Sequence, residues 1–354
     1  MAEGLRGVVR SGEWWDFKLV PILTGFYASL LLIRIPIAGQ WHALLVLLLS
    51  LLPGAAYVSI VNDLTDLDDD AAAGKANRMA GRSTLFRAAA LLATLVGGAL
   101  FFWHWRGHPL LLACYGAAWI AFTLYSVPPF RLKRRGLAGL VADAAGAHLF
   151  PTLLAASAAL ASAGAPPFQP WLVAVSLWAF AYGLRGNLWH QLLDRDHDRS
   201  AGVGTFAART SRAAAARLGA AIIFPAELAG LGWMLWRMHS PWPLLALAAH
   251  LLLVMRRVRL WRMRAVVSDP KGAYVILLHD YYDVFLPISL LFASALTHPW
   301  DWALLAVHLL LFHRRPLIVW HDGWKLVARP LLQRLRLVPP PRRADALDSG
   351  QCGP

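Results

Sequence analysis

Long apolar segments alternate with short polar connections along most of this chain. The segments lie near residues 17–37, 41–61, 85–103, 109–129, 137–160, 170–193, 213–238, 241–256 and 273–296. Most of them are long enough to cross a hydrocarbon core of about 30 Å as a helix. The pattern therefore predicts an all-α membrane protein, a bundle of about nine transmembrane helices.

The chain after residue 296 does not follow this pattern. Its apolar stretch 300–313 is shorter than a typical span, which suits either an interfacial helix or a short extra span. We divide the chain into a cytoplasmic N-terminal segment (1–16), a helical bundle (17–296), this C-terminal interfacial or short transmembrane segment (297–338) and a disordered tail (339–354).

Composition agrees with the membrane assignment. Hydrophobic residues make up 58% of the 354 residues and charged residues only 15%, whereas soluble domains are about 25% charged. The lipid bilayer is therefore the expected solvent, and membrane lipids are expected partners. The two cysteines, Cys114 and Cys352, indicate neither a disulfide framework nor a cysteine metal site.

Basic residues predict the orientation of the bundle. They occupy alternate connections, at Lys75/Arg78/Arg82/Arg87, Arg131/Lys133/Arg134/Arg135, Arg195/Arg199/Arg209/Arg212 and Arg256/Arg257/Arg259/Arg262/Arg264. By the positive-inside rule these loops and the N-terminus are cytoplasmic. The net charge of +14 is divided among short loops and does not line one exposed face, so we do not expect nucleic-acid binding.

Two clusters of acidic residues follow predicted spans on this cytoplasmic side. Asn62, Asp66 and Asp70 recur at i+4 after the second span, and Asp194 and Asp198 repeat that spacing after the sixth. On a helix each set would lie on one face, where like charges repel unless a cation lies between them. Mg²⁺ prefers a few carboxylates together with substrate phosphate oxygens. The sequence therefore predicts that these five residues bind Mg²⁺ and hold a diphosphate between the two clusters.

A basic segment separates the two acidic clusters in the chain. The run Tyr125 to Gly136 contains two prolines and then Arg131, Lys133, Arg134 and Arg135. Cations here could bind phosphate oxygens that the metal leaves free. We assign diphosphate binding to Lys75, Arg78, Tyr125, Arg131 and Lys133. Arg134 and Arg135 are the best candidates for a purely topological role.

These motifs resemble those of the UbiA superfamily of intramembrane prenyltransferases. The pattern N-D-x-x-D-x-x-x-D is met by Asn62, Asp63, Asp66 and Asp70, and D-x-x-x-D by Asp194 and Asp198. Tyr125 to Gly136 and Gly202 to Thr205 are similar to further segments of several members. The resemblance implies nine helices around a central cavity open to lipid, both acidic motifs at its cytoplasmic end, bound Mg²⁺ and a polyprenyl diphosphate donor.

The predicted reaction is transfer of an isoprenoid chain from an allylic diphosphate to a small aromatic or lipid acceptor. Metal ions and basic side chains would stabilise the negative charge of the departing diphosphate. The acceptor would then attack the allylic cation and lose a proton, for which Asp63 or Asp143 is available. We assign the catalytic roles to Asp63, Asp66 and Asp194.

The acceptor site is predicted from polar residues of the sixth span. The candidates are Arg185, Asn187, His190 and Gln191, together with Asp143. A charge at the depth of Arg185 needs a partner, which is Glu227, Asp143, Asp283 or an anionic ligand. The run from Arg185 to Gln191 matches no branch of the family, so the acceptor is left open. If the sixth span is structural, Asp143/His148 and His279/Asp283 are the next candidates.

Other functions are compatible with parts of the pattern. A terpene cyclase on the same scaffold would ionise the same diphosphate and close the chain on itself, and it ranks second. A phosphatidyltransferase of the CDP-alcohol type is disfavoured because its D-G-x-x-A-R run is absent from both acidic loops. A transporter would carry charges near the midplane of the membrane, whereas these cluster at one end of the spans.

Overall fold

A computed structural model describes residues 15–72, 74–200 and 202–335. The predicted cytoplasmic N-terminal segment, except for its last two residues, and the predicted disordered tail lie outside the described residues. The helices of the main bundle are η1 (Trp15–Leu19), α3 (Val20–Leu32), α4 (Trp41–Thr65), α6 (Thr84–His104), α7 (Pro109–Ser126), α8 (Leu137–Ala144), η4 (Ala145–Leu149), α9 (Phe150–Ser162), α10 (Gln169–Leu193), α13 (Arg212–Leu218), η5 (Gly219–Ile223), α14 (Phe224–Met238), η6 (Tyr281–Phe285), α16 (Leu286–Ala295) and α17 (Asp301–Leu311).

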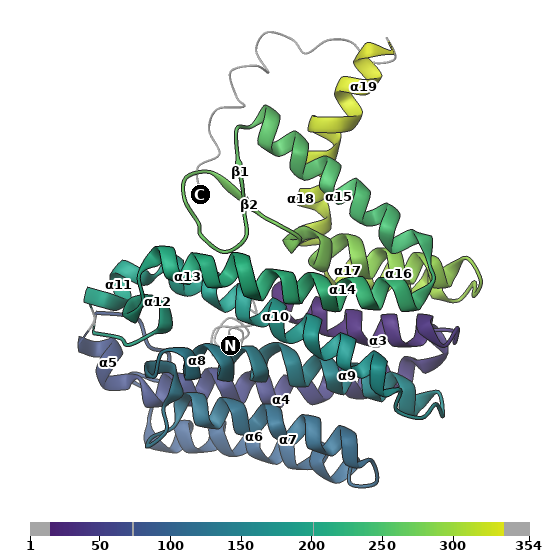
Figure 1. The fold of residues 1–354 in the computed structure, drawn as a ribbon. Coiled ribbons are helices and arrows are strands. Elements are labelled where there is room, and N and C mark those ends of the chain that lie inside the picture. Colours follow the sequence, from purple (N-terminus) through teal and green to yellow (C-terminus); the bar gives the residue numbers. More distant parts are fainter. Residues whose placement is uncertain (1–14, 73, 201, 336–354) are drawn as a thin grey trace.

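The shorter elements lie in the connections and at the C-terminal end. They are η2 (Ala38–Gln40), α5 (Leu67–Ala72), η3 (Leu132–Arg134), α11 (Arg195–Ser200), α12 (Phe206–Arg209), α15 (Pro241–Leu260), β1 (Arg264–Val266), β2 (Tyr274–Ile276), α18 (Arg314–Gly323), η7 (Trp324–Ala328) and α19 (Arg329–Arg334). Figure 1 shows the long helices of the bundle lying side by side, with α5, α11 and α12 together at one end. We call this the acidic end, because it carries both acidic motifs.

The centre of the bundle is formed by α3, which is buried on all sides. Every residue from Val20 to Leu30 is buried, as expected for a helix that is apolar around its whole circumference. Trp171 on α10 is fully buried and donates a hydrogen bond from Nε1 to Ser29 Oγ at 2.8 Å. Gly230 lets α14 approach α10 closely, because a Cβ there would lie 2.5 Å from the backbone nitrogen of Trp178. The walls around α3 are therefore tightly packed.

The predicted count of nine spans is not confirmed. Among the described residues, five helices are long and apolar enough to cross a membrane, and six if α17 and α18–α19 count as one bent span. The five are Ala38–Thr65, Thr84–His104, Pro109–Ser126, Leu137–Ser162 and Arg212–Met238. The helix α10 is 25 residues long, but it is not among the five. Polar side chains such as Arg185 and His190 make it less apolar than those helices. Phe17–Leu32 and Tyr281–Ala295 are apolar but shorter.

The prediction of a helical span over 273–296 is wrong at its start. Residues 274–276 form strand β2, which pairs in parallel with β1, and the helix begins only at Tyr281. The run Tyr274–Ile276 is made of β-branched and aromatic residues, which suit a strand as well as an apolar helix. Within the described ranges, the regular structure is thus helical apart from this two-stranded sheet and one isolated bridge between Gly136 and Thr205.

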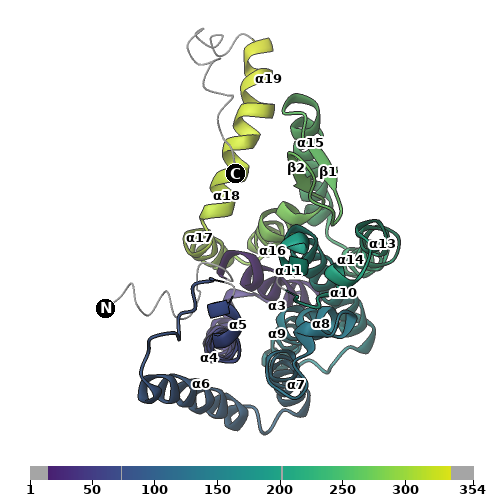
Figure 2. The ribbon, with the colours of Figure 1, turned by 90° about the vertical axis from the view of Figure 1, so that its left-hand side faces the viewer.

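The C-terminal part leaves the bundle at a sharp bend. The axes of the α17 and α18–α19 segments differ by 92°, and both views show α15, α18 and α19 projecting away from the other helices (Figures 1 and 2). Buried ion pairs hold the base of this projection: Arg257 on α15 donates to Asp322 on α18 at 2.6 Å and to Asp280 at 2.5 Å. The predicted short extra span is therefore a helix pair with a right-angled break.

Candidate active site

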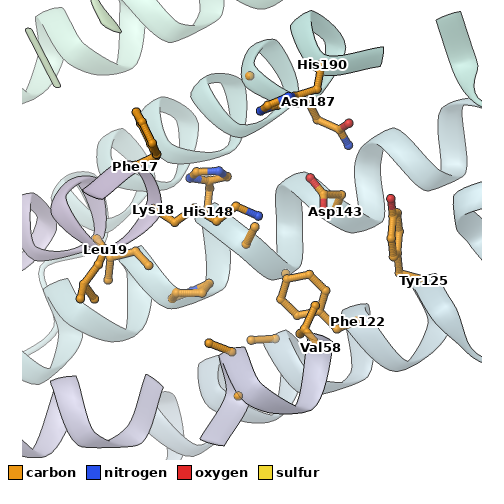
Figure 3. A pocket seen from close by; sticks show the side chains of 18 of the residues that line it. Phe17, Lys18, Leu19, Val58, Phe122, Tyr125, Asp143, His148, Asn187 and His190 are labelled. Atoms are coloured by element: carbon orange, nitrogen blue, oxygen red, sulfur yellow. The ribbon is translucent and has the colours of Figure 1, made fainter. Parts of the chain in front are cut away.

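A large cavity lies inside the bundle, enclosed by η1, α4, α7, α8–α9 and α10 (Figure 3). Its volume is about 980 Å³, at the upper end of the range for small-molecule sites. Apolar side chains such as Ile22, Val58 and Phe122 form much of its wall. Asn62, Asp194 and Asp198 line it at the acidic end. The cavity therefore offers an apolar chamber with carboxylates at one end.

Both predicted carboxylate ladders are present in helical geometry. The amide of Asp66 donates to the carbonyl of Asn62 at 3.0 Å, and that of Asp70 to Asp66 at 2.8 Å. The same i to i+4 bonds join Asp198 to Asp194 at 2.9 Å and Asp194 to His190 at 2.9 Å. Each ladder continues the backbone pattern of a long helix beyond its end, so its side chains lie on one face as predicted.

The first acidic motif is neutralised by the basic segment. Lys133 Nζ lies 2.6 Å from both carboxylate oxygens of Asp66, and Arg131 Nη2 donates to Asp66 and Asp69 at 2.6 Å each. Arg134 also pairs with Asp69. Arg131 adopts a left-handed backbone conformation, with φ of 39°, which a non-glycine residue rarely takes. The predicted phosphate-binding side chains thus contact the predicted metal ligand in this structure.

Other residues of the first motif are held by the loop after α5. Asn77 Nδ2 donates to Asp70 Oδ2 at 2.8 Å and to the carbonyl of Asp63 at 2.7 Å. Asp63 is buried, with 2% exposure, and lies 3.4 Å from Arg78 Nη1. Ser126 Oγ donates to Asn62 Oδ1 at 2.5 Å, which joins the motif to the end of α7. The buried Asp63 is therefore paired with the half-buried Arg78, and neither residue lines the cavity.

The second acidic motif is arranged differently. Asp198 accepts a hydrogen bond from Thr205 Oγ1 at 3.0 Å, whereas the Asp194 carboxylate makes no hydrogen bond or ion pair with a described residue. Burial, together with the neighbouring charge of Asp194, raises the pKa of the Asp198 carboxyl. Asp196 between them is exposed and points away from the cavity lining. Here the carboxylates face the cavity without a basic side chain in hydrogen-bonding contact.

The basic segment is joined to the loop that follows the second acidic motif. The Gly136 amide donates to the Gly204 carbonyl at 3.0 Å, and Arg209 Nη2 donates to the Arg134 carbonyl at 2.9 Å. Gly204 permits this approach, because a Cβ would lie 2.7 Å from the Arg134 carbonyl oxygen. The basic segment is consequently in contact with the first acidic motif and with the loop that follows the second.

The cavity brings together some of the predicted site residues and leaves others outside. The cavity-lining members are Asn62, Tyr125, Asp143, Arg185, Asn187, His190, Gln191, Asp194 and Asp198. Those next to its acidic end but outside the lining are Asp63, Asp66, Asp70, Lys75, Arg78, Arg131 and Lys133. Figure 3 shows Tyr125 and Asp143 near each other at one end, and Lys18 and His148 at the other.

The residues present fit a divalent cation chemically, although no metal cage is preformed. Among the described residues, no three carboxylates, histidines or cysteines converge closely enough to hold a metal ion. The fit rests on the second motif: burial and a like charge disfavour ionisation of Asp198, and a cation bound there would reverse both effects. Asn62, Asp66, Asp70, Asp194 and Asp198 are therefore the candidate oxygen donors.

The predicted acceptor residues on α10 divide into two groups. Arg185 forms a buried bidentate pair with Glu227, at 2.5 and 2.8 Å, so Glu227 is the partner among those expected. Gln191 Oε1 accepts from the Ala207 amide at 3.2 Å, which ties α10 to α12. Asn187 Nδ2 is buried without a hydrogen-bond partner, although its Oδ1 accepts from Gln191. Arg185 and Gln191 thus have structural contacts, and Asn187 retains a free donor.

Of three further cavity residues, Lys18 was not among the predicted site residues, and His148 and His279 were named only as alternatives to the sixth span. Lys18 and His279 line the cavity at the end away from the acidic motifs, and His148 lies beside them with no partner for its buried Nδ1. In the sequence, Lys18 is one of several basic residues near the start of the first span. The positive-inside rule accounts for such residues, so Lys18 gave no separate signal of a binding role. Asp69 was missed because it lies outside the i+4 spacing of the first ladder.

The fold and the site together define a membrane-embedded helical protein whose cavity carries acidic motifs at one end. The sequence model of the UbiA prenyltransferase family matches residues 19–279, so the chain belongs to this family. No curated protein sequence matches the chain significantly.

Among solved structures, the fold is similar to that of a UbiA homolog from Archaeoglobus fulgidus bound to GPP and Mg²⁺, with a TM-score of 0.52 and 16% identity over 86% of this chain and 99% of that one. For the UbiA homolog from Archaeoglobus fulgidus bound to DMAPP and Mg²⁺, the TM-score is 0.51 and the sequence identity is 16%. The match covers 91% of this chain and 98% of that one.

Proposed function

We propose that this protein is a Mg²⁺-dependent prenyltransferase that moves an isoprenoid chain from an allylic polyprenyl diphosphate to a small aromatic or lipid acceptor within the membrane. The observation that carries this proposal is that one largely apolar cavity is lined by Asn62, Asp194 and Asp198 at a single end. Membership of the family and the ligands of the Archaeoglobus fulgidus homolog, GPP, DMAPP and Mg²⁺, support the donor class.

The acidic end would bind the donor diphosphate. Bound Mg²⁺ supplies positive charge that stabilises the diphosphate as the allylic carbon–oxygen bond breaks. Asn62, Asp66, Asp70, Asp194 and Asp198 would hold it. Lys133 and Arg131 are 2.6 Å from Asp66 without ligand and would move onto phosphate oxygens when a metal neutralises that carboxylate. The apolar wall would accommodate the isoprenoid chain and exclude water from the allylic cation.

The opposite end of the cavity would bind the polar head of the acceptor. Lys18 lines the cavity there, and the buried Nδ1 of His148 has no hydrogen-bond partner. A buried polar atom without a partner costs about 1–3 kcal/mol, which a polar ligand would recover. An aromatic acid or a lipid phosphate offers both negative charge and acceptor oxygens. The basic loops favour a cytoplasmic location of the acidic end.

The test uses the full-length protein in lipid nanodiscs with radiolabelled geranyl, farnesyl or geranylgeranyl diphosphate. Each donor is incubated with 4-hydroxybenzoate, with a glycerol-phosphate lipid, or with no acceptor, in Mg²⁺ or in excess EDTA. We expect a prenylated acceptor in Mg²⁺ and none in EDTA. A cyclised hydrocarbon formed without acceptor would favour the terpene cyclase. Transfer that persists in EDTA, or no consumption of any donor, would contradict the proposal.

A further inference from the structure

A histidine–carboxylate pair lies in the wall of the cavity, away from both acidic motifs. His279 lines the cavity with 25% of its side chain exposed, and its Nε2 lies 3.2 Å from Oδ2 of the fully buried Asp283. The ring of Phe17, next to Lys18, stacks on the imidazole at 6.1 Å between centroids. The pair is therefore at the end of the cavity where the acceptor head is proposed to bind.

The surrounding structure holds this pair in place. Asp283 Oδ2 is also 3.9 Å from Arg315 Nε, and Arg315 donates to Asp280 at 2.8 Å. Asp280 in turn receives a hydrogen bond from Arg257 on α15. This network joins η6, α15 and α18 through Asp280, and the Asp283 carboxylate lies next to it inside the protein. The Asp283 carboxylate lies beside one ring nitrogen, where its negative charge would stabilise a protonated imidazole.

The backbone turns sharply where the pair begins. Leu278 adopts a left-handed conformation with φ of 61°, although it is a large and buried non-glycine residue. Such conformations are rare for non-glycine residues and cluster at functional sites. Here the turn separates β2 from η6 and places His279 at the cavity wall while Asp283 lies inside the protein. The strained residue thus supports a functional position for His279.

We propose that His279 is the general base that removes the proton from the acceptor, and that Asp283 positions it. In this step the carbon–oxygen bond of the donor breaks and its electron pair leaves with the diphosphate. A bond forms between the allylic carbon and the acceptor's oxygen or ring carbon, and the proton of that atom goes to Nδ1 of the neutral imidazole. Asp283 beside Nε2 stabilises the resulting imidazolium, as in other histidine–aspartate pairs.

The imidazole of His279 is neutral in the resting state. Burial, and after it the positive charge of Arg315, lowers the pKa of His279, so the ring is neutral at physiological pH. A neutral ring can accept a proton, whereas the carboxyl of Asp63 is occupied by Arg78 and does not line the cavity. Asp143 lines the cavity nearer the acidic end, next to Tyr125, and is the competing candidate.

The test rests on the proposed function and uses the donor and acceptor that give transfer with the wild-type protein. His279→Ala should lower the kcat of transfer by about 100-fold or more, with the donor KM unchanged within about twofold. Because the substitution leaves a space, added imidazole should restore at least part of the rate. Asp283→Asn should lower kcat by a smaller factor, again with little change in donor KM.

The matched control is His321→Ala. His321 also lies beside a carboxylate of the same ionic network, 3.7 Å from Asp322, but it is exposed and does not line the cavity. The His321→Ala variant should transfer the prenyl group at the wild-type rate. If His279→Ala does not fold, by thermal unfolding and size-exclusion chromatography, His279→Gln with the same kinetic comparison replaces it.

Three outcomes would overturn the inference while leaving the proposed function intact. They are wild-type kcat in both His279 variants, an equal loss in His321→Ala, and a folded His279→Ala enzyme whose rate imidazole does not change. Asp143→Asn losing kcat alone would assign the proton transfer to Asp143. By contrast, a wild-type protein that consumes no donor would refute the proposed function itself.

Discussion

The two acidic motifs have the same spacing in the sequence but opposite electrostatic surroundings in the structure. In the first motif, hydrogen bonds from Arg134 and Arg131 outweigh the effect of burial and lower the pKa of the Asp69 carboxyl. In the second, burial and the charge of Asp194 raise the pKa of Asp198. Asp66 and Asp69 of the first motif are therefore paired with basic side chains without a ligand, whereas Asp194 and Asp198 have no basic side chain in hydrogen-bonding contact among the described residues. This difference suggests that the motifs contribute differently to metal and donor binding.

The different surroundings of the two motifs affect the order in which metal and donor bind. A cation can bind at Asp194 and Asp198 without displacing a basic side chain. At Asp66 it must compete with Lys133 and Arg131, which lie at 2.6 Å. A diphosphate removes this competition, because it offers the same basic side chains another anion. We therefore expect the second motif to bind metal alone and the first to bind metal together with the donor.

The largest expected effect comes from removing a carboxylate of the second motif. Asp198→Asn keeps the shape of the side chain but removes its charge, so transfer should fall by at least about 100-fold, with Mg²⁺ binding weakened in the absence of donor. Asp66→Asn should reduce transfer similarly but leave donor-free Mg²⁺ binding nearly unchanged. The measurements are initial rates and Mg²⁺ titration by calorimetry.

Asp196→Asn is the control for this comparison. Asp196 lies between Asp194 and Asp198 in sequence but is 89% exposed and does not line the cavity. It should retain wild-type transfer. If Asp66→Asn and Asp198→Asn weaken donor-free Mg²⁺ binding equally, the two motifs form one site and the comparison fails.

The second prediction concerns the cation that neutralises the first motif. Lys133→Met should weaken donor binding by about tenfold, as expected for the loss of one hydrogen bond to a charged group. The same change frees Asp66, so donor-free Mg²⁺ binding should become tighter. Donor affinity is measured with a non-hydrolysable geranyl thiolodiphosphate. An unchanged Mg²⁺ affinity would show that Lys133 does not compete with the metal.

Arg135→Met provides the control for Lys133. Arg135 belongs to the same basic segment, but it donates to the carbonyl of Pro129 and pairs with no carboxylate of the described residues. It should alter neither donor nor Mg²⁺ affinity. Equal losses at both positions would instead indicate a topological or folding role for the whole segment.

The local parts of the site could be predicted from the sequence, and the long-range parts could not. The ladders Asn62/Asp66/Asp70 and Asp194/Asp198 follow from i+4 spacing, which depends only on helical geometry. The pairing of Asp69 with Arg131 joins residues 62 positions apart, and no local pattern encodes it. The basic segment was predicted to bind the diphosphate. Its contact with Asp66 could be seen only in the three-dimensional structure.

The same distinction holds for the fold. The long apolar helices α4, α6 and α7 follow directly from hydropathy, and their bounds are close to those predicted. The start of the last predicted span could not be obtained in this way, because Tyr274–Ile276 is apolar but forms a strand. The cavity position of His279 depends on that strand and on the turn at Leu278, so it was visible only as one of several alternatives in the sequence.

The third prediction uses pH to separate the motifs. Because the pKa of Asp198 is raised, protons should displace Mg²⁺ from the second motif at a higher pH than from an ordinary aspartate. Donor-free Mg²⁺ affinity should therefore fall as pH decreases through this raised pKa. Thr205→Val removes a hydrogen bond that lowers the pKa, so the fall should move to higher pH. Thr205→Ser should behave as wild type, and identical profiles in all three proteins would contradict the assignment.

The smallest expected effect concerns Asp69, a carboxylate of the first motif that has no counterpart in the second. It is not a predicted metal ligand, and it pairs with Arg131 and Arg134 at 42% exposure. Exposed ion pairs contribute about 0.2–1 kcal/mol, so Asp69→Asn should raise the donor KM by about two- to fivefold through less ordered basic side chains, with kcat unchanged. The matched control is Asp68→Asn, because Asp68 is exposed and its carboxylate has no partner among the described residues. A fall in kcat would show that Asp69 does more than position Arg131. An equal change in Asp69→Asn and Asp68→Asn would show that only the net charge of the loop matters.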